Sequence, residues 1–180
     1  MIRFGLIGSG SQGRYLSEAL LLAGGGELVA CADIVPEATA KAMAHCGYRQ
    51  AFDSYERMLA EAELDAVIVA TTHDQLQPAA LAAARAGKHV FVEKPMAQTA
   101  PAGRELAGEA RAAGVRLMVD YTVRFMPARL RMKRLLDSGA IGEVVHVTAG
   151  QLIGSLGGGW LASPAQGGGP VLYIGTHVLD

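Results

Sequence analysis

Short runs of apolar, mostly β-branched residues alternate with longer segments in which alanine and leucine recur at helical spacing through the first two thirds of the chain. This alternation is typical of strand–helix–strand units around a parallel sheet, so it predicts an α/β fold with a doubly wound parallel sheet. The apolar runs predict strands at Ile2–Ile7, Leu28–Asp33, Ala66–Ala70, His89–Glu93 and Arg116–Asp120.

The segments between these strands carry helix start and stop signals. One apolar helix face has the spacing i, i+3, i+4 and i+7, and it consists of Leu16, Ala19, Leu20 and Ala23. Three consecutive glycines from Gly24 stop that helix. Two further helices are predicted at Pro36–His45 and Ala79–Ala86. A short helix is expected to begin after a cap at Asp53 or Ser54, and another is expected to begin at Thr99 and Pro101 and to end at Gly114.

The pattern changes after Tyr121. A helix at about Pro127–Ser138 and a strand at Glu143–Leu152 are predicted, followed by a glycine-rich region. We therefore expect one domain at 1–121 and the beginning of a second at 122–180. The 59 residues after Tyr121 are too few for an ordinary sheet-based domain. If the chain ends here, we expect an exposed sheet edge, weak stability and little or no turnover.

The composition is that of a folded globular chain, with 180 residues of which 51% are apolar and 18% charged. The net charge of −1 gives no electrostatic reason to expect a nucleic-acid partner, and a small molecule is the better expectation. One predicted helix carries a basic cluster that we interpret as a solvated face. It consists of Arg129, Arg131, Lys133 and Arg134.

The cysteines and the uncharged stretches bear on the compartment. Cys31 and Cys46 lack CxxC spacing and predict a reducing environment. The chain begins directly with a strand, and glycines and prolines interrupt the uncharged stretch Val144–Leu179, so neither a signal peptide nor a membrane helix is expected. We expect a cytoplasmic protein without a membrane partner. Its histidines have no metal-ligand spacing, so no metal site is predicted.

A glycine-rich turn follows the first predicted strand and opens the first predicted helix. Gly8, Gly10 and Gly13 have the spacing GxGxxG, with Ser9 and Gln12 between them. Such glycines allow a tight turn and the close approach of backbone N–H groups to a pyrophosphate at a helix N-terminus. This pattern indicates a dinucleotide-binding site.

Asp33 strengthens this interpretation because it lies 20 residues after Gly13, at the end of the second predicted strand. A carboxylate there accepts hydrogen bonds from both hydroxyls of an adenosine ribose and repels a 2′-phosphate. The next residues are Ile34 and Val35, and neither can bind a phosphate. The sequence therefore predicts NAD as the cofactor in preference to NADP.

A second motif, Glu93-Lys94-Pro95, stands where the strand His89–Glu93 leaves the carboxyl edge of the predicted sheet, along which ligands bind. With this motif the whole chain resembles the glucose–fructose oxidoreductase/inositol dehydrogenase (Gfo/Idh/MocA) family. Residues 67–72, 121–125 and 167–177 fit the same family in the same order. The resemblance implies a Rossmann-type sheet followed by the incomplete start of an α+β substrate and dimerisation domain, and a homo-oligomer for the full-length protein.

The resemblance also implies roles for individual residues. Lys94 would reach the nicotinamide ribose and the substrate hydroxyl, and His177 would transfer the proton as hydride moves. Histidine suits this role physically because its ordinary pKa is about 6.5. A cis Lys94–Pro95 peptide is expected as well. The other implied cofactor contacts are Ala70, Thr71, Thr72, Glu93 and Pro95, and the implied substrate contacts are Tyr121, Arg124, Trp160 and Tyr173.

The chain departs from the family pattern at three places. Tyr173 stands where most members carry an aspartate four residues before the histidine, and a phenol can hydrogen-bond but lacks the carboxylate's charge. Leu76 stands where a histidine is common, and the stretch after Trp160 lacks the usual arginine and aspartate. We expect a less polar substrate pocket. Trp160 covers the nicotinamide or substrate, or serves in ordinary packing.

These features favour an NAD-dependent oxidoreductase that acts on a secondary hydroxyl or ketone of a sugar, cyclic polyol or related derivative. Two alternatives stay open. One is a glycoside hydrolase that works by transient oxidation with NAD kept bound, and net NADH release separates it from a dehydrogenase. The other is an inactive nucleotide-binding paralogue or regulator, motivated by Tyr173 and Leu76.

Overall fold

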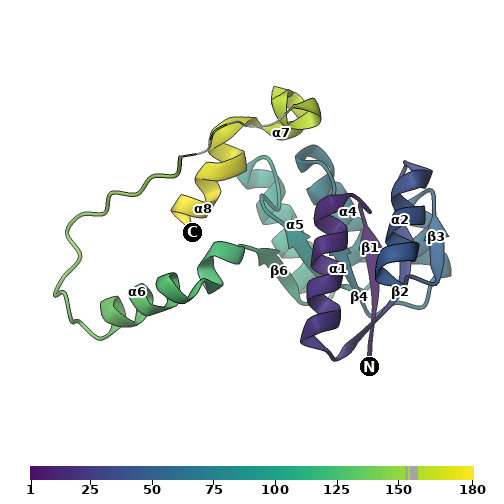
Figure 1. Cartoon of the computed structure of the whole chain (residues 1–180), viewed down its shortest axis with the longest axis horizontal. Helices are drawn as coiled ribbons and strands as arrows, with labels where there is room; N and C mark the ends of the chain where they lie inside the picture. The colour runs from purple at the N-terminus through teal and green to yellow at the C-terminus, as the bar shows by residue number, and fades with distance from the viewer. Residues whose placement is uncertain (153, 155–157) are drawn as a thin grey trace.

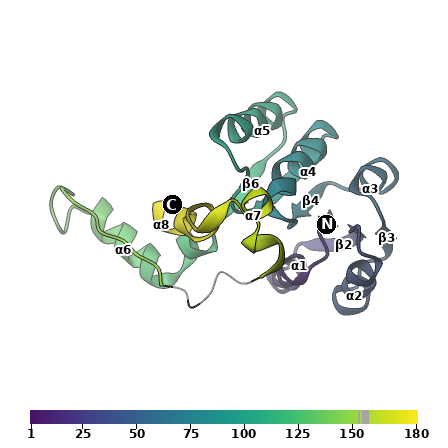
Figure 2. The same ribbon diagram turned by 90° about the horizontal axis from the view of Figure 1, so that it is seen from above.

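The computed structural model describes residues 1–152, 154 and 158–180 (Figures 1 and 2). Its strands are β1 (Ile2–Ile7), β2 (Gly26–Ala32), β3 (Gln50–Phe52), β4 (Ala66–Val69), β5 (His89–Glu93) and β6 (Leu117–Asp120). Its helices are α1 (Ser11–Ala23), α2 (Pro36–Cys46), α3 (Tyr55–Glu61), α4 (His73–Arg85), α5 (Ala100–Ala112), α6 (Pro127–Asp137), α7 (Pro164–Gly167) and α8 (Thr176–Leu179). Shorter helical turns are η1 (Thr122–Phe125), η2 (Gly159–Ala162) and η3 (Val171–Gly175).

The strands form one six-stranded parallel sheet in the order β3-β2-β1-β4-β5-β6. This doubly wound topology confirms the predicted fold class. The sequence pattern predicted five strands and missed β3, because this edge strand has only three residues, and two of them are exposed. Since β1 and β4 lie at the centre, the strand order reverses next to the glycine turn, where doubly wound sheets bind ligands.

Helices cover both faces of the sheet, with α1 and α2 on one face and α3, α4 and α5 on the other (Figure 2). Side chains alternate between the faces along β1, so Leu6 packs with α1 and α2 while Ile7 packs with the opposite helices. One apolar layer includes Leu16 of α1, and the other includes Leu106 of α5. These layers pack against the strands whose ends carry the candidate site.

One helix begins earlier than the sequence predicted. The expected helix Ala79–Ala86 is α4, which starts at His73 and contains Pro78. Pro78 is the sixth residue of α4, so it removes the hydrogen bond that a backbone N–H there would donate to the carbonyl oxygen of Asp74, and the burial of seven α4 residues offsets this loss. The longest helices have 13 residues, and none in the described ranges is long and apolar enough to cross a membrane. The other predicted helix bounds agree with the structure to within a few residues.

The predicted strand Glu143–Leu152 is wrong. These residues have no regular secondary structure, and all of them are exposed. A strand needs a neighbouring strand to pair its backbone groups, and the described residues provide none beside this segment. Helix α6 extends away from the sheet in both views, whereas the chain beyond it returns to the sheet, with α7 against α4 (Figures 1 and 2).

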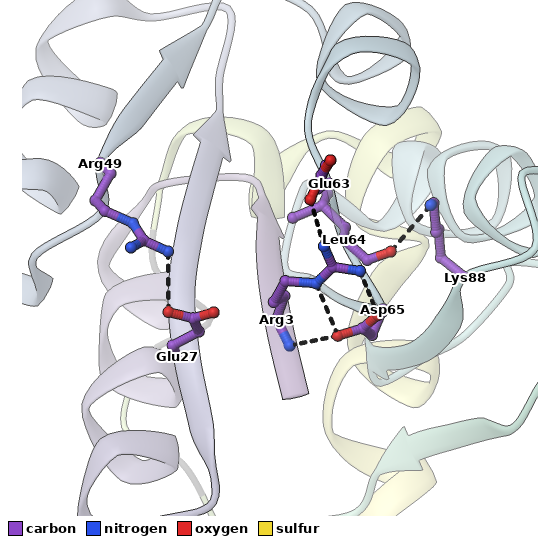
Figure 3. Close-up of polar contacts among 7 residues, drawn as sticks. All are labelled: Arg3, Glu27, Arg49, Glu63, Leu64, Asp65 and Lys88. Atoms are coloured by element: carbon purple, nitrogen blue, oxygen red, sulfur yellow. Dashed lines mark hydrogen bonds and ion pairs between the residues drawn. The ribbon is translucent and has the colours of Figure 1, made fainter. Parts of the chain in front are cut away.

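A charged network ties the amino ends of the strands, at the opposite edge of the sheet from the glycine turn (Figure 3). Arg3 donates to Asp65 from its backbone N–H and from Nη2, each over 2.8 Å, and to Glu63 over 2.7 Å. The Arg3 guanidinium holds the pKa of Asp65 well below its usual range. This network fastens β1 to the loop before β4, and it leaves the carboxyl edge as the place for chemistry.

Candidate active site

The glycine turn between β1 and α1 approaches its neighbours too closely for larger side chains. Gly8 has a φ of +90°, and a Cβ there would lie 2.4 Å from the carbonyl oxygen of Ala70. A Cβ at Gly13 would lie 2.1 Å from the carbonyl oxygen of Gly8. A Cβ at Gly10, in contrast, would meet no described atom within 4 Å. Gly8 and Gly13 therefore shape the turn, whereas Gly10 leaves its surface clear for a ligand.

The N-terminus of α1 favours an anion. Gly10 is its N-cap and supplies no side-chain hydrogen bond, and the first turn contains no acidic residue. The first N–H groups of the helix are therefore left without side-chain partners, at the positive end of the helix dipole. Together with the clear surface at Gly10, this geometry fits the pyrophosphate of a dinucleotide.

Asp33 follows β2 and lies against the glycine turn. Its Oδ2 accepts a hydrogen bond of 2.7 Å from the Ser9 backbone N–H, and its Oδ1 accepts one of 2.9 Å from the Val35 N–H. These bonds fix the carboxylate, and each oxygen keeps a further lone pair for a hydroxyl. Ile34 beside it is 89% exposed and offers an apolar surface. The turn and the acid predicted from sequence are thus brought together.

Beyond β4, Ala70, Thr71 and Thr72 lead into α4, and Ala70 forms the wall against Gly8. Thr72 is the N-cap of α4, and its side chain makes no capping hydrogen bond. The three residues therefore follow β4 at the carboxyl edge of the sheet, beside the glycine turn.

Two buried carboxyl groups lie side by side where β5 and β6 end. Glu93 and Asp120 are register partners and are 8% and 5% exposed. Glu93 accepts a hydrogen bond of 2.6 Å from Gln12 Nε2 and one of 2.9 Å from the Lys94 N–H. Burial and the neighbouring Asp120 carboxylate raise the pKa of Glu93 to about 7, and burial also raises the pKa of Asp120. Near neutral pH the two groups therefore share a proton.

Lys94 begins the cis Lys94–Pro95 peptide, which confirms the expected geometry. Its Nζ donates a hydrogen bond of 2.8 Å to the carbonyl oxygen of Tyr173 and lies 4.4 Å from the centroid of the Tyr173 ring. Burial lowers the pKa of Lys94, and the charges of Glu93 and Asp120 oppose that effect. Tyr173 thus contacts Lys94 through its carbonyl and its ring face.

His177 lies on α8, four residues after Tyr173. Its ring centroid is 6.3 Å from that of Tyr121, and the two rings are nearly perpendicular. Burial and the Lys94 charge lower the pKa of His177, whereas Asp120 and Asp180 act in the opposite direction. The imidazole is therefore mainly neutral at pH 7, the form that can accept a proton.

Arg124, expected at the substrate, is turned toward the last residue of the chain. Its Nε donates to Asp180 Oδ2 over 3.1 Å, and Nη2 makes a second contact with the same carboxylate. Both residues and His177 line a cavity of about 300 Å³ between η1, α6 and α8. Of the candidate catalytic residues, only His177 lines this cavity in the described part of the chain.

His73, at the start of α4, is a site residue for which the sequence suggested no role. It is 4% exposed, and its Nδ1 lies 2.8 Å from the carbonyl oxygen of Gly167. Its ring packs edge-on against Trp160 at 4.8 Å and lies 5.8 Å from the Tyr173 ring. Its position at the carboxyl edge, just after β4, was the available signal. Leu76 is fully buried in the apolar core beneath α4.

The Gfo/Idh/MocA family model, an oxidoreductase family with an NAD-binding Rossmann fold, matches residues 2–121, and the GFO/IDH/MocA C-terminal domain matches residues 130–180. The chain belongs to this family. Its sheet and glycine turn are accordingly those of an NAD-binding Rossmann fold, in agreement with the cofactor predicted from Asp33.

Individual members of the Gfo/Idh/MocA family share about a third of their residues with the chain. The 1,5-anhydro-D-fructose reductase of Ensifer adhaerens is 35% identical, with 100% of this chain and 55% of that protein covered. The inositol 2-dehydrogenase of Rhizobium meliloti is also 35% identical, with 82% and 44% covered. The chain therefore spans about half the length of such relatives.

Solved structures give the same result. The WlbA dehydrogenase from Bordetella pertussis, crystallised with NADH and UDP-GlcNAcA, has a TM-score of 0.74 and 35% identity, with 78% of this chain and 43% of that chain covered. A scyllo-inositol dehydrogenase from Lactobacillus casei, crystallised with NAD(H) and scyllo-inositol, has a TM-score of 0.74 and 26% identity, with 79% and 43% covered.

Proposed function

We propose that this protein is an NAD-dependent oxidoreductase that transfers hydride between the nicotinamide and a secondary hydroxyl or ketone of a sugar, cyclic polyol or related derivative. The observation that carries the proposal is the position of Lys94 at the sheet edge that also bears the glycine turn, where its Nζ donates to the carbonyl oxygen of Tyr173, four residues before His177. The named activities of the relatives, an anhydrofructose reductase and inositol dehydrogenases, support this substrate class.

The glycine turn and Asp33 form the cofactor half of the proposed site. The α1 N-terminus at Gly10 would hold the pyrophosphate, and Asp33 would accept the hydroxyls of the adenosine ribose. When bound, NAD supplies the nicotinamide ring that accepts or donates hydride. Because the Asp33 carboxylate is fixed by two backbone N–H groups, it cannot turn away from a 2′-phosphate, and this supports NAD over NADP.

Lys94 and His177 form the reactive half. The Lys94 ammonium group would orient and polarise the substrate oxygen, sharing its donors between that oxygen and the Tyr173 carbonyl. His177 would remove the hydroxyl proton in the oxidation and return it in the reduction. Its lowered pKa supports this role, because the neutral imidazole is the proton acceptor. Tyr121, Trp160 and Tyr173 would provide the walls around the substrate.

The proposal includes the organisation of the chain. We place the cofactor domain at 1–121 and the beginning of the substrate domain at 122–180, in a protein that forms a homo-oligomer. Cys31 and Cys46 are buried free thiols, and this supports a reducing compartment such as the cytoplasm.

Calorimetric titration of NADH and NADPH is the direct test of the cofactor half. We expect NADH to bind more tightly than NADPH and Asp33→Ala to weaken NADH binding. Equal or tighter binding of NADPH would contradict the assignment of Asp33.

A panel of polyols and sugars, screened for release of NADH from NAD⁺, tests the reaction. Once a substrate is found, Lys94→Ala and His177→Ala should each lower turnover by roughly a hundredfold or more while NADH binding is kept. Full activity of either variant would remove that residue from the mechanism. Turnover of a glycoside without net NADH release would favour the hydrolase instead.

A further inference from the structure

Asp120 is a buried carboxylate beside the candidate reactive residues, and the proposed reaction does not use it. It ends β6, next to Glu93 in register, and only 5% of its surface is exposed. Burying a carboxylate costs free energy unless hydrogen bonds or opposite charges compensate it. Beyond the proton that Asp120 shares with Glu93, it therefore needs a further partner at this edge of the sheet.

The two carboxyl groups of the pair differ in their hydrogen bonding. Glu93 uses both oxygens, toward Gln12 and the Lys94 N–H. Asp120 Oδ2 is buried without a partner among the described residues, and so is His177 Nδ1. Unpartnered buried polar atoms are rare because each is costly. An Nδ1–H hydrogen bond to Asp120 Oδ2, direct or through one water molecule, would satisfy both atoms.

We propose that Asp120 is the positioning carboxylate of His177, which receives the Nδ1–H hydrogen bond and so leaves the Nε2 lone pair for the substrate proton. This inference rests on the proposed function, in which His177 is the base. A carboxylate at Nδ1 fixes both the tautomer and the orientation of an imidazole. Since Tyr173 brings no carboxylate to the site, Asp120 supplies the negative charge from β6.

The surrounding charges leave Asp120 available for this role. Asp180 is paired with Arg124. Glu93 is protonated near neutral pH and then carries no negative charge that would compete with Asp120. Lys94 is the cation shared by the group, and burial raises the pKa of the Tyr121 phenol, so Tyr121 adds no negative charge at pH 7. Asp120 is thus the carboxylate that faces both Lys94 and His177 without an arginine partner among the described residues.

The test is the tautomer and titration of His177, read by ¹⁵N NMR on the histidine-labelled chain. It needs neither substrate nor NAD, so its outcome is independent of whether the proposed reaction is found. The chain has five histidines, and His177→Gln assigns the signal. We expect neutral His177 to carry its proton on Nδ1. In Asp120→Asn this preference should be lost and the titration should move to lower pH, whereas Asp120→Glu should retain both properties.

Asp74→Asn is the matched control, because Asp74 also has a buried oxygen without a partner in the described residues but acts on His73. It should lower the pKa of His73 and leave His177 unchanged. The proposal is overturned if the tautomer and the titration of His177 are the same in Asp120→Asn and in the unmodified chain. It is also overturned if neutral His177 carries its proton on Nε2. This outcome is read from the unmodified chain, so it does not depend on whether a variant at position 120 folds.

Discussion

Replacing Glu93 by glutamine should make the chain less sensitive to pH. The folded-state pKa of Glu93 is about 7, against an ordinary value of 4.5, because burial and Asp120 disfavour the charged form. The folded state therefore binds the proton more tightly than the unfolded state. The resulting stabilisation is fully present below pH 4.5 and is lost as the pH rises through 7.

The size of the effect follows from the shift. At 1.36 kcal/mol for each pKa unit, the raised pKa corresponds to about 3 kcal/mol of unfolding free energy. Glutamine resembles the protonated acid and does not titrate. The unfolding free energy of Glu93→Gln, relative to that of the unmodified chain at the same pH, should therefore rise by about 3 kcal/mol between pH 4.5 and pH 8.

Urea unfolding at a series of pH values measures this difference, with far-ultraviolet circular dichroism as the signal. Glu109→Gln is the matched control, because Glu109 is a partly exposed carboxylate on α5 whose pKa is lowered by hydrogen bonds from Arg85. The unfolding free energy of Glu109→Gln relative to the unmodified chain should instead fall as the pH rises, since the stability that Glu109 contributes is lost as the pH falls. A difference for Glu93→Gln that stays constant or falls with pH would refute the reasoning and mean that Lys94 keeps Glu93 ionised.

Other expected outcomes concern the glycine turn and the contact between α4 and the glycine-rich segment. Gly10→Ala should change the unfolding free energy by less than about 1 kcal/mol and weaken NADH binding in calorimetry, because its Cβ enters clear space. Gly13→Ala should cost about 3 kcal/mol or more in urea unfolding, because its Cβ meets backbone. Trp160 is the single tryptophan and packs against His73, so its fluorescence should change as His73 is protonated below pH 6.5. The variant His73→Asn keeps a hydrogen-bond donor for Gly167 and should abolish this change. An unchanged titration in His73→Asn would assign it to another group.

The sequence pattern predicted much of the fold because the core is made of local periodicities. The apolar run at Ile2–Ile7 and the glycine spacing after it are short-range signals, and a parallel sheet buried on both faces needs such continuous runs. The sequence pattern did not predict the edge strand Gln50–Phe52, because only its pairing with β2 defines it. The segment 143–152 carried a strand pattern but has no strand beside it in the described structure, so the pattern alone could not make a strand.

For the candidate site, the sequence by itself determined the glycine turn, Asp33 and the Glu93-Lys94-Pro95 motif, because each is set by its position at a strand end. The tertiary structure decided which distant groups meet. It placed Asp120 beside Glu93 through the register of β5 and β6, and it placed His73 under Gly167 through a contact between residues 94 positions apart. Sequence spacing carries no information about such contacts, because they depend on how the strands order and how the returning chain packs on the sheet edge.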